Sequence, residues 1–571
     1  MIIPMHIDAV PNRGSRPTYL LRESIREGRK VRKRTLANLS ALSDDQIDTI
    51  RAVLRGEPLQ PAKEMFEAVA SPACGHVDAV RLAMQQLGLA RLLHSRPCPE
   101  RELVLAMIAA RVLCPDTKLA TTRHWHGSTL AEDFGVVDAG VDDLYAAMDW
   151  LLARQDRIQK KLARRHLSDG GLVLYDLSSS YLEGRHCPLA RLGHNRDGKK
   201  GKLQVNYGLL TDQRGCPVAV SVHEGNTADS KTLLPEVARL KDRFGLSGFV
   251  IVGDRGMISH KAIEAMRTSG VDWITALKSV SIRKLVEQEY LQLDLFDQRN
   301  LFALTHPDYP GERLVACRNP ALAQHRAGKR EALLQATEAA LGKIRERVAT
   351  GRLIGADAIG LAVGKVVDRY KVAKHFDLDI EADGFDFTRN VERIAAEAAL
   401  DGVYVIRTSV PEPTMEAADC VRNYQSLARV ERAFRSLKTM DLKIRPIHHR
   451  LADRIRAHIF LCMLAEYVAW HLREAWRPLL FADEDQAAKR ETDPVAPARR
   501  SPQAEDKIHR KTTEDGLPLH SFQTLLDALS GIVRNLCRAP GAAQTAPTFT
   551  MTTTPNPVQR RALDLAAQIR V

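Results

Sequence analysis

Paired cysteines, long apolar runs and aromatic residues are all scarce in this sequence. Its nine cysteines are an odd number, and no two of them stand at CxxC spacing. Neither a disulfide framework nor a zinc site is therefore indicated, and we expect free thiols throughout.

Membrane and export signals are also missing. No stretch approaches the ~20 uninterrupted apolar residues that a bilayer span requires. Residues 1–12 lack the charged start and apolar core of a secretion signal. We therefore expect a cytoplasmic protein without a membrane partner.

The chain does have ordinary globular composition and an excess of positive charge. Of its 571 residues, 44% are hydrophobic and 27% charged. This length suggests roughly three or four domains, or one large domain with insertions. Lysine and arginine outnumber aspartate and glutamate by 13. Such a balance favours a polyanionic partner, usually nucleic acid, through phosphate neutralisation.

The first 168 residues contain a basic hairpin and then a helical region. Residues 18–39 have the pattern of two strands around the turn Glu27-Gly28, and residues 22–34 hold seven basic and two acidic side chains. Such a hairpin suits either a DNA backbone or a plain solvated face. Residues 60–168 show apolar side chains at helical spacing. They fit a helix-turn-helix-like DNA-binding unit and a simple helical bundle equally well.

An α/β pattern begins near residue 171. Residues 172–177 form a short apolar run, and alternating residues at 203–209 and 218–222 predict two half-buried strands. A helix is expected at about 230–244, capped by Asp229. Then come an apolar strand at 249–252 and a further helix and strand ending near residue 276. Three strands in a meander followed by helix-strand alternation predict a mixed sheet covered by helices.

Patterns are weaker from about residue 286 to 400, which we interpret as an insertion containing a helix at 330–347. The α/β pattern returns with a strand at 403–406 and a helix reaching Met440. Residues 452–475 predict a strongly apolar helix. Beyond about residue 482 the chain is polar and proline-rich, which is consistent with a disordered linker. One late helix is expected there from the spacing of Leu525, Leu529, Ile532 and Leu536.

Two aspartates occupy unusual places in this pattern. Asp176 lies inside the apolar strand, where an ionised carboxylate is costly unless it is paired or binds a metal. Asp254 directly follows the strand at 249–252. Because adjacent strands lie about 4.8 Å apart, carboxylates at matching strand ends could share a cation. A helix cap or an ion pair with Arg255 is the alternative.

A third carboxylate lies on the helix that ends near Met440. Tyr424, Leu427, Glu431, Phe434 and Lys438 follow one another at intervals of three and four, so they share one helix face. Glu431 could point at the two aspartates from a mainly apolar stripe. Alternatively, it pairs with Arg435 four residues on. Arginines beside the stripe could line a phosphate backbone; these are Arg422, Arg429, Arg432 and Arg435.

Three such carboxylates suffice to hold two Mg²⁺ ions ~4 Å apart, one activating the attacking oxygen and the other stabilising the leaving oxygen. Mg²⁺ is a hard cation that prefers oxygen ligands and retains waters, so carboxylates suit it. No histidine is needed as a base.

These residues resemble the DDE transposases of bacterial insertion sequences, in the group marked by a Tyr-x2-Arg-x3-Glu-x6-Lys signature. The matching stretches are Tyr175-Asp176, 225–229, 253–256 and 424–438, and the likeness runs from about 171 to 440. One signature position departs, because Leu427 stands where the group has arginine. Arg429 or Arg435 could replace that arginine.

The resemblance implies a ribonuclease H-like core with catalytic, metal-binding Asp176, Asp254 and Glu431, two Mg²⁺ ions that Mn²⁺ can replace, and DNA contacts from Tyr424 and Lys438. It also implies cleavage and joining at element ends, with terminal inverted repeats and target DNA as partners. A homodimer is expected in the DNA-bound synaptic complex. Two alternatives remain: a nuclease that cuts without joining, and a transposase-derived DNA-binding protein without catalysis.

We expect six segments along the chain. They are a basic hairpin arm (1–60), a helical region that is a candidate for DNA binding (61–168), the first part of the core (169–285), an insertion domain (286–400), the second part of the core with the catalytic helix (401–480), and a polar linker with C-terminal helices (481–571).

Further candidates have two interpretations each. The glycine-rich loop at 185–202 holds six basic residues, among them Lys199 and Lys200, and one acid, Asp197. It could guide a DNA strand toward the metals or simply be a solvated loop. Trp273 could receive a flipped base or lie in the core. His223, next to Glu224, is either a general base or a strand end.

Overall fold

The computed structural model describes the chain except residues 1, 29, 58–64, 185, 486–491 and 498. It divides into two compact units. Unit 1 combines Met1–Pro72 with Val533–Thr553, and unit 2 combines Ala73–Ile532 with Thr554–Val571.

Unit 1 begins with a three-stranded antiparallel sheet in the order β1 (Ile2–Asn12), β2 (Ser15–Glu27) and β3 (Lys30–Asn38). The predicted hairpin is the β2–β3 pair. The preceding strand β1 was not predicted. Its sequence contains Pro4 and Pro11, which weaken the strand signal but are tolerated because β1 lies at the sheet edge. Helix α1 (Asp44–Leu54) follows and is capped by Ser43.

A second sheet of unit 1 joins residues from both ends of the chain. Strand β15 (Arg534–Arg538) lies between β4 (Glu67–Ala70) and β16 (Phe549–Thr552), antiparallel to both. Leu536 therefore belongs to a strand, and the late helix expected to reach it ends earlier, as α20 (Phe522–Ser530). That prediction was wrong at its C-terminal end because strand pairing, a long-range contact, determines the conformation there.

The helical region of unit 2 packs on the long helix α17 (Ala452–Ala475), whose bounds match the sequence prediction. The apolar stripe Val77, Val80, Met84 and Leu87 is buried as expected. The helices share one hydrophobic core with the neighbouring sheet. Their bounds are α2 (Gly75–Gln86), α3 (Leu89–Leu93), α4 (Pro99–Leu113), α5 (Lys118–His124), η2 (Trp125–Gly127), α6 (Leu130–Asp133), α7 (Val141–Leu152) and α8 (Gln155–His166).

An eight-stranded mixed sheet forms the centre of unit 2, in the order β10-β11-β14-β9-β8-β5-β6-β7. Strands β5, β6 and β7 form an antiparallel meander, and β8 and β9 then continue parallel to β5. A meander followed by parallel strands on its other side is the ribonuclease H-like arrangement, as expected. The bounds are β5 (Leu172–Tyr181), β6 (Gln204–Asp212), β7 (Pro217–Glu224), β8 (Val250–Val252), β9 (Asp272–Ala276), β10 (Leu301–Leu304), β11 (Arg313–Arg318) and β14 (Val403–Thr408).

The helices that connect these strands are short. The helix expected at 230–244 is divided into three segments. The bounds in this region are η3 (Asp229–Lys231), α9 (Leu233–Ala238), η4 (Arg239–Arg243), α10 (His260–Thr268), α11 (Ser279–Glu287) and η5 (Leu293–Asp297).

The range interpreted as an insertion divides its residues between two structures. Strands β10 and β11 extend the main sheet through β14. The remainder forms a separate hydrophobic core around Leu341, Ile359 and Phe385. It comprises α12 (Pro320–Ala349), α13 (Ala356–Tyr370), η6 (Ala373–His375), β12 (Phe376–Ile380), β13 (Phe385–Arg389) and α14 (Val391–Ala398).

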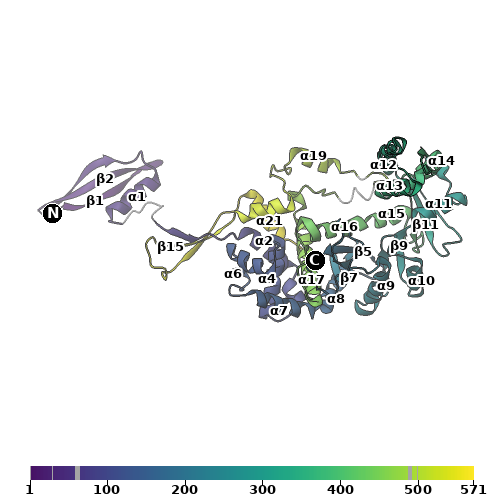
Figure 1. Cartoon of the computed structure of the whole chain (residues 1–571). Helices are drawn as coiled ribbons and strands as arrows, with labels where there is room; N and C mark the ends of the chain where they lie inside the picture. The colour runs from purple at the N-terminus through teal and green to yellow at the C-terminus, as the bar shows by residue number, and fades with distance from the viewer. Residues whose placement is uncertain (1, 29, 58–64, 185, 486–491, 498) are drawn as a thin grey trace. The chain divides into compact units, whose positions relative to one another are not determined.

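The C-terminal part is more ordered than its composition predicts. Residues 486–491 and 498 lie outside the described residues. Beyond them, α19 (Pro502–Arg510), α20 and α21 (Pro557–Ala567) are regular helices, each capped at its N-terminus by a serine or asparagine. Figure 1 shows α21 beside α2, and both α20 and α21 contact α2. A disordered linker is therefore wrong for these helices, and α20 and α21 bury apolar side chains such as Leu525, Leu529 and Ala562.

Two further expectations can be compared with the structure. None of the nine cysteines is in a disulfide, as predicted. Within the described ranges, no helix has the length and apolar character needed to cross a bilayer.

Candidate active site

Asp176 projects from the middle of β5, where it pairs in register with Leu209 of β6. Its Oδ1 accepts a hydrogen bond of 2.8 Å from the backbone N–H of Leu177. Burial raises the pKa of this carboxyl to about 7, and the negative charges of Asp254 and Glu431 act in the same direction. The site therefore disfavours a bare negative charge on Asp176 and would be stabilised by a cation.

Asp254 follows β8, the parallel neighbour of β5. Leu174 lies opposite Val252, so both strands run toward the same sheet edge. The Asp254 side chain is exposed there, and the backbone N–H of Gly256 donates to its Oδ2 at 3.4 Å. The expected sharing of one edge by the two aspartates is therefore present.

Glu431 comes from α16 (Leu427–Arg435), which lies against β5 (Figure 1). The single long helix expected here is divided into α15 (Ala417–Gln425), α16 and the π-helical turn η7 (Ser436–Met440). Phe434 anchors α16 by packing edge-on against Tyr207 of β6, with ring centroids 5.7 Å apart.

The predicted helix face opens onto a cleft of about 890 Å³ that also holds both aspartates. All five members of the predicted face line this cleft: Tyr424, Leu427, Glu431, Phe434 and Lys438. Its described charged lining residues also include Asp176, Asp254, Arg435, Arg196, Asp197, Asp229 and Arg445.

The three carboxylates form no ion pair among the described residues, although the charge of Arg196 is felt at Asp176. Within the described part of the chain, none of them has an ion-pair partner within 4.0 Å, so neither Arg255 nor Arg435 neutralises them as the alternatives required. Their oxygens do not all lie within 4.8 Å of one another. A single ion would need closer ligands, but two ions ~4 Å apart would be held by a wider set.

Positively charged side chains also line the cleft. Lys438 Nζ donates to Asp197 Oδ1 at 2.9 Å, and Arg445 pairs with the same oxygen. Arg196 donates to both oxygens of Asp229, at 2.6 and 2.7 Å. The prediction that Asp229 caps a helix was therefore wrong. Asp229 instead holds an arginine of the loop at 185–202 in the cleft.

Tyr424 lies next to the aspartates. Burial raises the pKa of its hydroxyl to about 12, and the negative charge of Asp254 contributes to this shift. The phenol is therefore protonated near neutral pH and is able to donate a hydrogen bond to a phosphate oxygen.

The two arginines considered as replacements for the missing signature arginine point to different places. Arg435 lines the cleft. Arg429 instead donates from Nη1 to the backbone carbonyl of Gln213, at 2.5 Å, in the turn between β6 and β7. Lys199 and Lys200 are exposed on the basic loop and do not line the cleft; Arg185 lies outside the described residues.

Two other candidates are placed away from the chemistry. Trp273 is 2% exposed in β9 and belongs to the core, so it cannot receive a displaced base. His223 contacts Ser221 Oγ at 3.1 Å near the end of β7 and does not line the cleft. Trp273 is therefore a core residue, and His223 belongs to a strand end.

Sequence reasoning missed Asp197, Arg196, Asp229 and Arg445 as parts of the cleft. Only Asp197 gave a usable signal, as the single acid in a basic, glycine-rich loop. Its partner Lys438 is 241 residues away in the sequence, and Arg445 is farther still. Only the folded chain brings these residues together.

The sequence matches two protein-family models. The transposase DDE domain matches residues 184–466, a range that contains Asp254 and Glu431 and begins after Asp176. The N-terminal domain of IS1634 family transposases matches residues 7–67. No curated protein matches the chain. Among solved structures, a piggyBac transposase synaptic complex with hairpin DNA matches at 8% identity with a TM-score of 0.34, covering 80% of this chain and 76% of that chain. Such a distant overlap carries no weight here.

The ribonuclease H-like sheet, the carboxylate cleft and the two matches together define a DDE transposase, an enzyme class that breaks and rejoins DNA. More narrowly, the chain belongs to the DDE transposases of bacterial insertion sequences, and its N-terminal match is to the IS1634 family. Its function is DNA transposition.

Proposed function

We propose that Asp176, Asp254 and Glu431 are the catalytic residues and together hold two Mg²⁺ ions, for which Mn²⁺ can substitute. When bound, the ions supply activation of the attacking oxygen and stabilisation of the leaving oxygen during phosphodiester cleavage and transfer. The observation that carries the proposal is the raised pKa of Asp176 in a cleft shared with two further carboxylates, for which the described residues provide no ion-pair partner.

The chemistry of the donors supports Mg²⁺ over a softer metal. The three side chains offer only carboxylate oxygens, the ligands that this hard cation prefers. Their combined negative charge would also be unfavourable in a half-buried cleft without cations.

The positively charged residues that line the cleft are then available to bind DNA phosphates. Lys438, Arg435 and Arg445 bind the phosphates on either side of the scissile bond, and Tyr424 donates its hydroxyl to a phosphate oxygen. Because these groups line the same cleft as the carboxylates, a DNA strand bound there has its backbone held close to them and oriented for attack. Lys199 and Lys200, at the exposed loop, extend this contact along the strand.

The proposed partners are the terminal inverted repeats of the element and its target DNA, met in the cytoplasm. The enzyme cleaves at the element boundary and joins the freed 3′-hydroxyl to the target. Two element ends must be held together for this, so a homodimer forms in the DNA-bound complex.

The central test replaces Asp254 by Asn or Glu431 by Gln. Each variant is expected to lose Mg²⁺-dependent cleavage of a labelled element end while still shifting that end in a gel. Glu416→Gln is the matched control, since Glu416 is exposed just before α15, makes no capping hydrogen bond and lies outside the cleft. Undiminished cleavage by Asp254→Asn would refute the proposal.

Joining is tested separately from cutting. A pre-cut end carrying a free 3′-hydroxyl is incubated with plasmid target and Mg²⁺, and covalent products are scored. Their absence, with cleavage intact, would leave a nuclease that cuts without joining. Absence of both activities, with end binding intact, would leave a DNA-binding protein only.

A further inference from the structure

A second set of metal-ligand side chains lies outside the cleft. His166 ends α8, Cys216 lies in the turn between β6 and β7, and His471 is near the end of α17. One potential ligand atom from each lies within 4.8 Å of the other two. We propose that His166, Cys216 and His471 bind a structural zinc ion.

The geometry is close to that of a zinc site. Cys216 Sγ and His471 Nε2 are 3.7 Å apart. Bonds of about 2.3 Å to sulfur and about 2.0–2.1 Å to nitrogen at a tetrahedral angle place such ligands about 3.6 Å from each other. Only small side-chain movements would therefore bring all three to one ion.

The donor set also selects the metal. One sulfur and two imidazole nitrogens suit Zn²⁺, whereas the cleft offers only oxygens and suits Mg²⁺. The two sites therefore differ in chemistry, and occupancy of one does not imply occupancy of the other.

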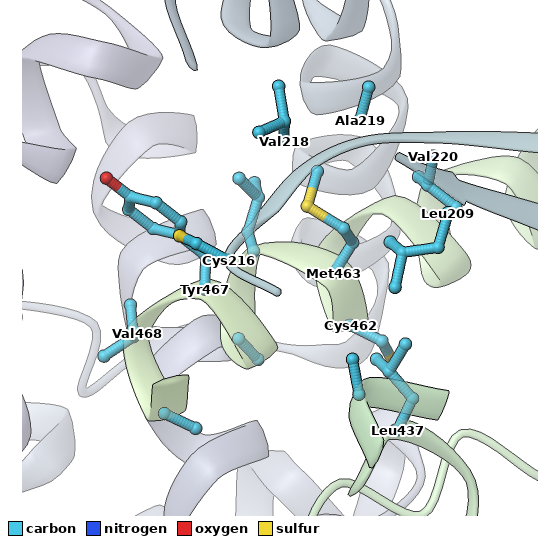
Figure 2. Close-up of a cluster of buried hydrophobic side chains, with 14 of the residues drawn as sticks. Leu209, Cys216, Val218, Ala219, Val220, Leu437, Cys462, Met463, Tyr467 and Val468 are labelled. Atoms are coloured by element: carbon cyan, nitrogen blue, oxygen red, sulfur yellow. The ribbon is translucent and has the colours of Figure 1, made fainter. Parts of the chain in front are cut away.

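The fourth coordination position of the zinc ion is open to water or to the hydroxyl of Tyr467, which lies 2.9 Å from His166 Nε2. Figure 2 shows Cys216 beside Tyr467 in the buried cluster.

The protonation states are compatible with binding. Burial lowers the pKa of His166 to about 4 and that of His471 to about 3, so both imidazoles are neutral donors. Burial raises the pKa of the Cys216 thiol, with the charge of Asp212 acting in the same direction. Coordination removes a proton from such a thiol. The resulting thiolate and Asp212 supply two negative charges next to the ion, where Arg165 and Arg214 are also close.

The ion would connect three parts of unit 2: the helical region, the main sheet and α17. The turn that carries Cys216 also supports α16, since Gln213 accepts the hydrogen bond from Arg429 and a Cβ on Gly215 would meet Arg429 Cβ at 2.7 Å. Zinc at this place would fix the turn beneath the helix that carries Glu431. The lack of CxxC spacing indicates no zinc site within one short segment, but it does not apply to ligands from positions 166, 216 and 471.

The test uses the untagged full-length chain, purified without chelator, and measures bound zinc by mass spectrometry. We expect about one zinc ion per chain. After exchange for Co²⁺, a thiolate-to-cobalt charge-transfer band is expected in the near ultraviolet. The carboxylate cleft cannot produce this band, because no cysteine thiol is among its described lining residues and the only sulfur among them is the thioether of Met257.

Substitutions of the proposed ligands test whether the bound zinc lies at this site. Cys216→Ser should abolish the cobalt band and weaken zinc binding at least 100-fold, on the order of the largest losses seen when even an outer partner is removed. Cys462→Ser is the matched control, since Cys462 is also buried and lies 3.9 Å from a histidine, His458, but is not part of a three-ligand group among the described residues. It should keep both the zinc and the band. His166→Gln, at a half-buried position, provides a second ligand variant should Cys216→Ser fold poorly.

Three results would overturn the proposal: a wild-type chain without zinc and without a cobalt band after Co²⁺ addition, zinc binding by Cys216→Ser equal to that of the wild type, or equal losses in Cys216→Ser and Cys462→Ser. Asp254→Asn should retain zinc. The zinc proposal and the proposed catalytic site can therefore fail independently.

Discussion

Lys438 donates a 2.9 Å hydrogen bond to Asp197, whose side chain has no exposed surface. Asp197 is held in turn by Arg445 and by the backbone N–H of Tyr181, which donates to Oδ2 at 3.1 Å. A residue of the loop before β6 thus positions the signature lysine at the edge of the cleft.

The first prediction concerns this buried charge group. Asp197→Asn leaves Lys438 and Arg445 without their common anion, and removing one partner of a buried pair costs about 3–5 kcal/mol in the free energy of unfolding. Urea denaturation followed by tryptophan fluorescence measures the loss. Glu183→Gln is the control, because Glu183 forms an exposed ion pair with Lys202 on the same loop, worth about 1 kcal/mol or less. Equal effects of the two changes would contradict the prediction.

The second prediction follows from the raised pKa of Asp176. A carboxyl whose folded pKa is about 7 and whose ordinary value is 3.8 contributes stability that is full below pH ~4 and is lost as the pH rises through about 7. In EDTA, the melting temperature of the wild type should therefore fall over this window relative to that of Asp176→Asn.

Mg²⁺ should reduce the loss of folding stability that accompanies ionisation of Asp176. It competes with the proton for the carboxylate, so its stabilising effect on the melting temperature should be larger at about pH 8 than at about pH 5.5. Asp254→Asn removes a charge that raises the pKa of Asp176 and should move the window to lower pH. A pH profile that does not change on replacing Asp176 would show that another group controls it.

The third prediction separates Arg435 from Arg429. Arg435 lines the cleft, so Arg435→Ala should weaken binding to element ends and reduce the dependence of log Kd on log salt by about one unit. Arg429 is committed to the Gln213 carbonyl, so Arg429→Ala should leave the salt dependence unchanged. Fluorescence anisotropy at several salt concentrations measures both. The opposite ranking would mean that Arg429 leaves Gln213 to reach DNA.

The fourth prediction tests the packing behind Asp176. A Cβ on Gly208 of β6 would lie 2.3 Å from the hydroxyl oxygen of Tyr175, which is fully buried. Gly208→Ala should therefore overpack the sheet and cost about 1–3 kcal/mol in the free energy of unfolding. A Cβ on Gly248 would meet nothing within 4 Å, so Gly248→Ala is a matched control with little expected change. A neutral Gly208→Ala would mean that Tyr175 can move without cost.

Local pattern was sufficient where burial repeats at short intervals. Strand β5 and helix α17 were predicted from their apolar runs, because both elements are buried along most of their length. The edge shared by Asp176 and Asp254 and the five-residue face of α15, α16 and η7 were predicted from strand and helix periodicity. The break between α15 and α16 at Ser426 was not, since both sides keep the same helical periodicity.

Local pattern failed where a distant segment decides the conformation. Leu536 continued a helical spacing, yet it pairs with Ala70 of β4. Asp229 had the sequence context of a helix cap, yet a guanidinium from the preceding loop offered it two stronger, charge-assisted hydrogen bonds.

The sequence by itself determined the class of protein and predicted Asp176, Asp254 and Glu431 as its catalytic carboxylates, because strand and helix periodicities and a spaced signature can be read along the chain. Only the tertiary structure decided what surrounds them: that Lys438 is held by Asp197, that Arg435 and not Arg429 faces the cleft, and that His166, Cys216 and His471 meet. These contacts join residues far apart in the chain, and their energies depend on burial and on charges that no local spacing encodes.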